Sequence, residues 1–160
     1  MRAWLAACVL ALAACSEAPA DPEAEFQREL ATAKEQARAS LPVFWESFKE
    51  PGAEDYDFRL KASLDRRDGQ PGQEEAWVEN VVRSDNGIVG DLADQPRYLG
   101  DLKEGSVVQF QEHQVVDWGF MRGEKLLGNY TTRVMLPRME TTQAEWLRAL
   151  LSATPEGGTP

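Results

Sequence analysis

The spacing of apolar residues changes from a helical to a strand period near Tyr56, and this change limits the folds open to the chain. From Tyr56 to Leu64 apolar and polar residues alternate, which is the period of a half-buried strand. Before Tyr56, apolar residues recur every three or four positions, as on one face of a helix. Those positions are Phe26, Leu30, Ala33, Ala37, Leu41, Phe44 and Phe48. A helical part followed by strands predicts an α+β domain.

Local signals indicate where the helical part begins and where it is interrupted. Asp21-Pro22-Glu23 is typical of a helix start, because aspartate caps the first amides and proline fits the first turn. Pro42 lacks an amide hydrogen and is expected to break or kink the helix near residues 39–41. Ser40 can cap a second short helix that runs to about Phe48. We therefore predict an N-terminal helix pair.

About six antiparallel strands are predicted between residues 56 and 136. Asp85-Asn86-Gly87 indicates a hairpin, because Asn and Gly tolerate the positive φ of a type I′ turn. The last strand is expected over residues 126–136, with Gly128 as a bend. A capping box at Thr142-x-x-Glu145 predicts a short C-terminal helix. The strands form either a bent sheet or a partly open barrel, and the pattern favours neither.

The first residues predict that the protein is exported to the cell envelope. Residues 1–14 read as a signal peptide, with Arg2 before an apolar run that is too short to span a bilayer. The box Leu12-Ala13-Ala14-Cys15 resembles the processing site of bacterial lipoproteins, in which the cysteine becomes the lipidated N-terminus. We expect a lipid on Cys15 to anchor the protein to a membrane. An aspartate directly after the lipidated cysteine is the usual signal that keeps a lipoprotein from being sorted to the outer membrane. Position 16 is Ser16 instead, which favours the periplasmic face of the outer membrane.

Composition limits the partners and the chemistry of the remaining chain. We expect a lipidated tether over residues 15–21, a single α+β domain over 22–152 and a disordered tail over 153–160. The net charge of −10 disfavours nucleic acid as a partner and favours a basic one. The chain has two cysteines, one within the signal peptide and one expected to carry lipid. No thiol then remains for nucleophilic catalysis or a zinc–thiolate site.

Short motifs in the strand region, taken together and in order, resemble the YegJ-like family, domain-of-unknown-function family 2314. The resemblance covers residues 56–136 and implies a compact α+β domain, often in bacterial envelope proteins, with no assigned activity. In the family's pattern a histidine commonly lies between the glutamate that corresponds to Glu74 and the tryptophan that corresponds to Trp77. Here Glu75 and Ala76 fill that interval. A site built on that histidine would be absent or altered. The motifs are Phe58-Arg59-Leu60-Lys61, Glu74 with Trp77-Val78, Gly87-Ile88-Val89-Gly90 with Pro96, Leu102-Lys103-Glu104-Gly105, Val116-Asp117-Trp118 and Gly128-Asn129-Tyr130-Thr131-Thr132-Arg133.

Five residues are candidates for a binding surface on one face of the sheet: Trp77, Asp117, Trp118, Tyr130 and Arg133. Asp117 interrupts an apolar strand, where aspartate is depleted, so its presence needs a reason. It is either a buried acceptor for backbone or hydroxyl donors, or a carboxylate that faces a ligand. Arg133 either pairs with an acidic residue across the strands or belongs to the surface itself.

Catalytic and metal-binding signals are weak. His113 is the single histidine, and Glu112-His113-Gln114 is expected to be a solvated turn between two strands. Transition-metal sites usually use more than one imidazole, so we expect no metal and no cofactor. The sequence has no phosphate loop, nucleophile elbow or zinc-protease motif.

Three functions remain open at this point. The first is a non-catalytic envelope lipoprotein that binds a peptide, protein or glycan. The second is an acidic inhibitor or immunity-type protein that engages a basic periplasmic enzyme. The third is an envelope hydrolase that uses Asp117 and a glutamate.

We predict that Cys15→Ser removes the protein from the membrane fraction, because the thiol that carries the lipid is lost. Intact mass and membrane fractionation check this, and the wild-type mass should show the loss of residues 1–14. A variant that still fractionates with membranes, together with wild-type protein that keeps those residues, would contradict the lipoprotein interpretation.

Overall fold

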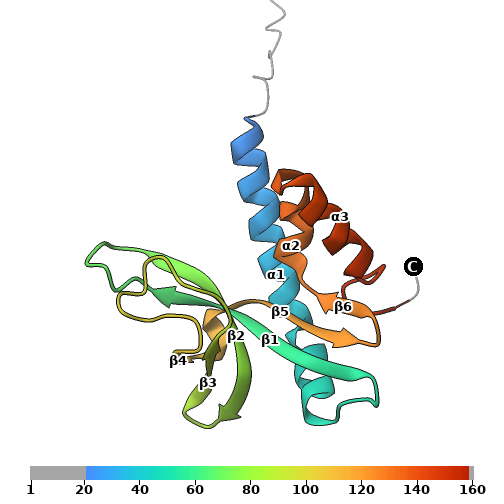
Figure 1. Ribbon diagram of the computed structural model, residues 1–160, viewed down its shortest axis with the longest axis horizontal. Coiled ribbons are helices and arrows are strands. Elements are labelled where there is room, and N and C mark those ends of the chain that lie inside the picture. Colours follow the sequence, from blue (N-terminus) through green and yellow to red (C-terminus); the bar gives the residue numbers. More distant parts are fainter. Residues whose placement is uncertain (1–20, 159–160) are drawn as a thin grey trace, which may run out of the picture.

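The computed structural model describes residues 21–158, and their fold is the expected α+β type. The predicted signal peptide, Cys15 and residues 15–20 of the tether lie outside the described residues. One long helix, α1 (Pro22–Lys49), packs on a bent six-stranded antiparallel sheet, and two shorter helices lie beside its N-terminal half (Figure 1). None of the helices within residues 21–158 has the length and apolar character needed to cross a bilayer.

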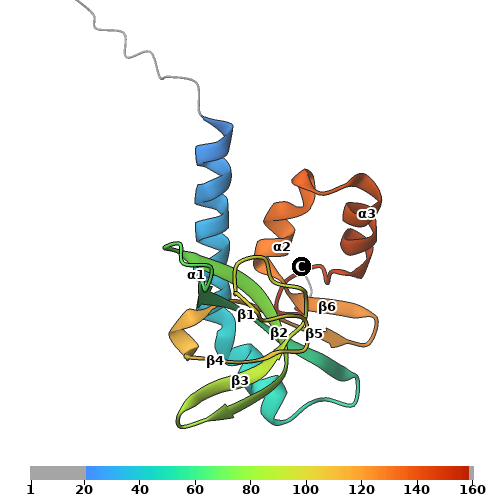
Figure 2. The same cartoon turned by 60° about the vertical axis from the view of Figure 1, so that its left-hand side comes forward.

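The sheet has the order β4-β3-β2-β1-β5-β6 and is open, with β4 and β6 at its edges (Figure 2). It is therefore a bent open sheet and not a partly open barrel. A 3₁₀ turn, η1 (Glu112–Gln114), precedes β5, and a second, η2 (Leu136–Arg138), lies between the last two helices. The strands and short helices are β1 (Asp55–Asp65), β2 (Gln73–Ser84), β3 (Gly87–Leu92), β4 (Val107–Phe110), β5 (Val115–Arg122), β6 (Lys125–Gly128), α2 (Tyr130–Met135) and α3 (Thr141–Leu150).

α1 is one continuous helix, and the predicted helix pair is wrong in this detail. Pro42 lies inside the helix on its exposed side, while Leu41 and Phe44 are buried against the sheet. Proline removes one amide donor, but the apolar face continues through it, so packing on the sheet keeps the two halves together. Ser40 caps no second helix, because its hydroxyl donates to the carbonyl oxygen of Gln36 (2.9 Å).

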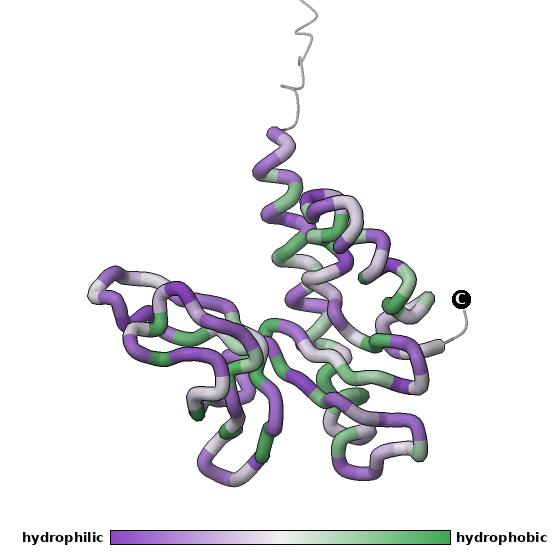
Figure 3. The backbone as a smooth tube through the Cα atoms, in the orientation of Figure 1, coloured by the Kyte–Doolittle hydropathy of each residue, from purple (hydrophilic) through white to green (hydrophobic). Residues whose placement is uncertain are grey.

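Aromatic packing holds α1 on the inner face of the sheet. The Phe44 ring lies 5.6 Å from Phe58, 6.1 Å from Trp118 and 6.4 Å from Phe120. The Trp118 indole also donates to the carbonyl oxygen of Ala37 (3.0 Å), which fixes the height of the helix over the strands. Along the tube in Figure 3, short apolar stretches are separated by hydrophilic ones, as expected for elements buried on one side.

The last predicted strand ends early. β6 stops at Gly128, and residues 130–135 form α2 instead of continuing the strand expected over 126–136. Gly128 (φ 67°) and Asn129 (φ 55°) are both left-handed, and this pair turns the chain out of the sheet. A side chain at 128 would collide with the carbonyl oxygen and indole ring of Trp118. The position therefore requires glycine both for its conformation and for the close approach to β5.

The C-terminal segment, residues 151–158, is ordered against β6, so the prediction of a disordered tail over 153–160 is wrong for residues 153–158. Leu151 forms a parallel bridge with Leu126. The amide of Gly128 donates to the carbonyl oxygen of Pro155 (2.7 Å). The segment thus covers the outer edge of β6, which would otherwise expose unpaired backbone groups.

We predict that Gly128→Ala lowers the free energy of unfolding by about 3 kcal/mol or more, because left-handed strain adds to a steric clash. Gly105→Ala is the matched control, since Gly105 is also left-handed (φ 77°) but a Cβ there meets no atom within 4 Å. That variant should lose only about 1–2 kcal/mol. Urea unfolding measures both, and equal losses would contradict the close approach at Gly128.

Candidate functional site

The five residues predicted to form one binding surface lie in different environments. Trp118 and Asp117 are 0% exposed and Tyr130 is also buried, while Trp77 and Arg133 are partly exposed. Alternation along β5 turns Trp118 toward α1 and Asp117 toward the opposite face. The structure therefore gives no single surface of five residues. Trp77 lines one cleft, Tyr130 and Arg133 line another, and Asp117 and Trp118 support the fold between them.

Asp117 is a buried acceptor that holds the start of α2. Its Oδ1 accepts from the amides of Trp118 (2.8 Å) and Tyr130 (3.1 Å). Its Oδ2 accepts from the amide (2.8 Å) and the hydroxyl (2.6 Å) of Thr131. The side chain of Asn129, at the N-cap position of α2, makes no capping bond, so Asp117 supplies the cap from a neighbouring strand. Burial raises the pKa of Asp117, and the four hydrogen bonds oppose that rise.

A row of charged residues lies beside Asp117 on the outer face of the sheet. Lys61 is its cross-strand neighbour, and the Lys61 ammonium lies 3.4 Å from the Thr131 hydroxyl. The same ammonium lies 3.5 Å from a carboxylate oxygen of Glu75, which also pairs with Lys34 from α1. Glu75 is thus bound to two lysines and holds α1 to the sheet.

The adjacent Glu74 is also structural. Its carboxylate accepts from the amides of Arg97 and Tyr98, each at 2.7 Å, and so anchors the loop between β3 and β4. The two neighbouring carboxylates are therefore engaged by separate partners and form no acid–base pair.

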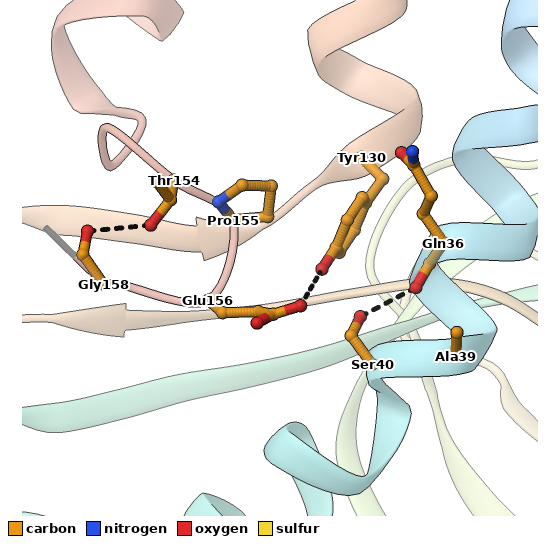
Figure 4. A pocket seen from close by; sticks show the side chains of 8 residues that line it. All are labelled: Gln36, Ala39, Ser40, Tyr130, Thr154, Pro155, Glu156 and Gly158. Atoms are coloured by element: carbon orange, nitrogen blue, oxygen red, sulfur yellow. Dashed lines mark hydrogen bonds between the residues drawn. The ribbon is translucent and has the colours of Figure 1, made fainter. Parts of the chain in front are cut away.

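A groove, here called the α1–α2 groove, runs between α1, the start of α2 and the C-terminal segment. It consists of two adjoining cavities of about 630 Å³ each, which share Gln36, Tyr130 and Pro155. Figure 4 shows side chains from all three segments facing one another around one of these cavities. The other lining residues are Ala39, Ser40, Thr154, Glu156 and Gly158 in one cavity, and Glu25, Arg28, Glu29, Thr32, Ala33, Arg133 and Val134 in the other.

Polar groups line both cavities of the α1–α2 groove. The Tyr130 hydroxyl bonds with the carboxylate of Glu156 (3.2 Å), and burial, together with that carboxylate, raises the pKa of Tyr130. Arg133 donates to the carbonyl oxygens of Gly128 and Ser152 (3.0 Å each) and to the Ser152 hydroxyl (3.1 Å). Burial lowers the pKa of Arg133. Among residues 21–158, Arg133 forms no ion pair with an acidic residue across the strands: Glu79 pairs with Arg59 (3.2 Å), and Asp117 binds the start of α2.

A second, smaller cleft of about 200 Å³ lies between α3 and the outer face of the sheet. Its walls are largely apolar, and Trp146, which is 63% exposed, stands at its edge. The sequence predicted a short C-terminal helix here but no separate role for Trp146. No pattern within the helix distinguishes a core tryptophan from one at the rim of a cleft. The remaining lining residues are Asp57, Arg59, Trp77, Gly119, Met121, Leu126, Asn129 and Leu147.

His113 is an exposed residue of η1, as predicted for a turn. It lines a cavity of about 410 Å³ together with Ser63 and Asp65. The Ser63 hydroxyl donates to the Gln73 side chain (2.7 Å). Over residues 21–158 no hydrogen bond joins His113 to Ser63 or Asp65, so the three side chains do not form a nucleophile–base pair. The same residues contain no group of three or more potential metal ligands.

Comparison with known proteins places the chain in a family. A family described as "Uncharacterized protein conserved in bacteria (DUF2314)" matches residues 27–150. The chain belongs to this family. "Uncharacterized protein YegJ" of Escherichia coli (strain K12) is 27% identical over 78 residues, which are 49% of this chain and 51% of the relative. The chain thus spans about half the length of that relative. No solved structure gives a significant match.

The part of the chain that matches DUF2314 extends from α1 through α3. It includes Asp117, the start of α2 and most of the α1 wall of the groove. Glu25 and residues 154–158 lie outside the matched range and complete the groove from both ends of the described chain.

We predict that Asp117→Ala lowers the free energy of unfolding by about 1–3 kcal/mol, because it leaves three amides and one hydroxyl without their acceptor. Thermal or urea unfolding checks this. The matched control is Asp91→Ala on β3, whose carboxylate bonds an exposed asparagine and should cost less than about 0.5 kcal/mol. A melting curve of Asp117→Ala that overlays wild type would contradict the capping role.

The same carboxyl predicts a pH dependence. Since the pKa of Asp117 is raised above its ordinary value of 3.8 in the folded protein, the folded state binds this proton more tightly than the unfolded chain. Its contribution to stability is complete below pH 3.8 and is lost as the pH rises through the folded-state pKa. The stability of wild type relative to Asp117→Asn should therefore fall as the pH rises. A difference that grows with pH would show that the four hydrogen bonds outweigh burial.

Proposed function

We propose that this protein is a non-catalytic lipoprotein of the cell envelope, and that its α1–α2 groove binds a short peptide or a glycan. The observation that supports this most is the groove itself. It is built from three separate segments, and its polar and apolar side chains face a common space (Figure 4). Ligand sites in proteins are concave, with a few polar groups set among apolar walls.

The size of the groove favours a short ligand. In the cavity that Arg133 lines, the α1 wall extends from Glu25 to Gln36, and the eleven residue steps between them rise by roughly 16 Å. Four residues of extended peptide span about 13–14 Å. A tetrapeptide or a short oligosaccharide therefore matches the length of this cavity, whereas a whole protein surface would meet only the rim of the groove.

Two hydroxyls of the groove, those of Ser40 and Thr154, favour binding over catalysis. Ser40 donates to the carbonyl oxygens of Gln36 and Ala37, and Thr154 donates to that of Gly158 (2.8 Å). A serine or threonine nucleophile needs a neighbouring base to take its proton. These hydroxyls give their protons to backbone carbonyls instead, which suits side chains that shape a site.

The proposed anchor would keep the groove close to the membrane. Five residues lie between Cys15 and Asp21, the first described residue, and the six residue steps that join them reach at most about 20 Å. The groove begins at Glu25, only one turn into α1. A lipid on Cys15 would thus hold the mouth of the groove near the headgroups.

The net charge of −10 supports a second candidate, an acidic inhibitor of a basic envelope enzyme. Such a complex would rely on the whole surface and weaken steeply with added salt. A short ligand held inside the groove would depend much less on salt, so the two functions are separable by titration.

We predict that Gln36→Trp blocks the groove where its two cavities meet and weakens ligand binding at least tenfold. Gln27→Trp is the matched control, because Gln27 is also an exposed glutamine of α1 but does not line the groove. Calorimetry of the full chain in detergent, against a panel of tetrapeptides and cell-wall di- and trisaccharides, measures both variants. Binding that survives Gln36→Trp would place the ligand elsewhere, and a panel with no ligand would contradict the proposed function.

A further inference from the structure

We propose that the α1–α2 groove recognises a short peptide by its free termini, with the terminal carboxylate at Arg133 and the terminal ammonium at Glu25 and Glu29. This inference rests on the proposed function, because it assumes that the groove is a binding site. It goes further in choosing a peptide over a glycan and in assigning the direction in which the peptide lies.

Arg133 has no direct carboxylate partner, and Asp117 acts on its charge only from a distance. Three of its five N–H groups donate to two carbonyl oxygens and a hydroxyl, all of which are neutral. No carboxylate among residues 21–158 forms an ion pair with it. Five other arginines do have carboxylate partners: Arg59, Arg66, Arg83, Arg122 and Arg138.

The position of Arg133 in the groove suggests that its counter-ion comes from a ligand. The side chain is only partly exposed and lines the groove, so its charge is poorly compensated by water. The bonds to Gly128 and Ser152 also hold the guanidinium in place. A fixed guanidinium with two unused N–H groups is suited to a carboxylate, which accepts charge-assisted hydrogen bonds.

The α1 wall of the same cavity supplies the opposite charge. Glu25 and Glu29 are exposed, lie one helical turn apart on one face and line the groove. Neither forms an ion pair with a cation of the described chain. Two carboxylates at this spacing repel each other, and an ammonium group bound between them would relieve that repulsion.

The middle of the groove is neutral and suits a peptide backbone. Thr32 and Gln36 present a hydroxyl and an amide, while Ala33, Val134 and Pro155 are apolar. Arg28 also lines this cavity, so the α1 end carries two carboxylates and one guanidinium and stays acidic by one charge. A zwitterionic peptide therefore meets an acidic end, a neutral centre and the guanidinium of Arg133. A neutral glycan would leave Arg133 without a counter-ion, and a polyanion would meet Glu25 and Glu29.

The test compares three forms of one probe, tetra-alanine, by calorimetry with the full chain in detergent. The probe with both free termini should bind at least tenfold more tightly than its C-terminal amide, which cannot pair with Arg133. It should also bind at least tenfold more tightly than its N-acetyl form, which has no ammonium for Glu25 and Glu29. Equal binding of the amide and the free acid would overturn the assignment of Arg133.

Protein variants give an independent readout. Arg133→Gln should weaken the free acid at least tenfold and leave the weak binding of the amide within twofold. Arg138→Gln is the control, because Arg138 is also near α2 but pairs with Glu23 outside the groove, and it should change neither. If Arg133→Gln does not fold, the comparison of the three probes on wild type decides the question alone.

The outcomes separate this inference from the function on which it rests. If tetra-alanine binds, Gln36→Trp abolishes that binding and the amide binds equally well, the inference fails while the groove remains a binding site. If a saccharide binds in the groove and tetra-alanine does not, the inference fails in the same way. If nothing in the panel binds, the proposed function and the inference both fail.

Discussion

Two adjacent residues of β5 hold both long walls of the groove. Trp118 points to the inner face and bonds the carbonyl oxygen of Ala37, which fixes α1. Asp117 points to the outer face and bonds the first two amides of α2. Tyr130 connects the two, since its amide binds Asp117 while its ring lies 5.8 Å from the Trp118 ring. Because a strand alternates its side chains, one dipeptide can hold two neighbouring helices through bonds made from opposite faces of the strand.

The third wall of the groove, the C-terminal segment, is held by the sharp turn of the chain after β6. Gly128 turns the chain into α2, and its amide binds Pro155 of the C-terminal segment. Arg133 then reaches from α2 to Gly128 and Ser152, so it ties α2 to β6 and to that segment. The side chain that joins these segments also presents to the groove a guanidinium with no direct carboxylate partner. Its structural bonds are what keep it fixed there, and a fixed donor loses little entropy when a ligand binds.

The sequence predicted the parts of the fold that depend on local periodicity. Alternation from Tyr56 to Leu64 placed β1, although Tyr56 itself is exposed, and the helical spacing from Phe26 to Phe48 gave the face of α1 that packs on the sheet. It failed where a tertiary contact overrides a local signal. Pro42 is tolerated because the apolar face packs continuously, and residues 130–135 are helical because Asp117, distant in sequence, caps them. The ordered C-terminal segment likewise depends on backbone partners in β6 that no local pattern reveals.

The binding residues were predicted only in part, and the reason is electrostatic as much as geometric. Arg133 and Tyr130 were recognised as candidates, but Glu25 and Glu29 looked like ordinary solvated charges on an acidic protein of net charge −10. At physiological ionic strength, the interaction between exposed charges is largely screened beyond about 8 Å. The overall net charge therefore says little about the electrostatics inside a groove. Within that distance the local arrangement decides, and here both signs line one cavity. An acidic protein can therefore bind a ligand of no net charge without attracting cations in general, because the selectivity comes from the spacing of fixed opposite charges.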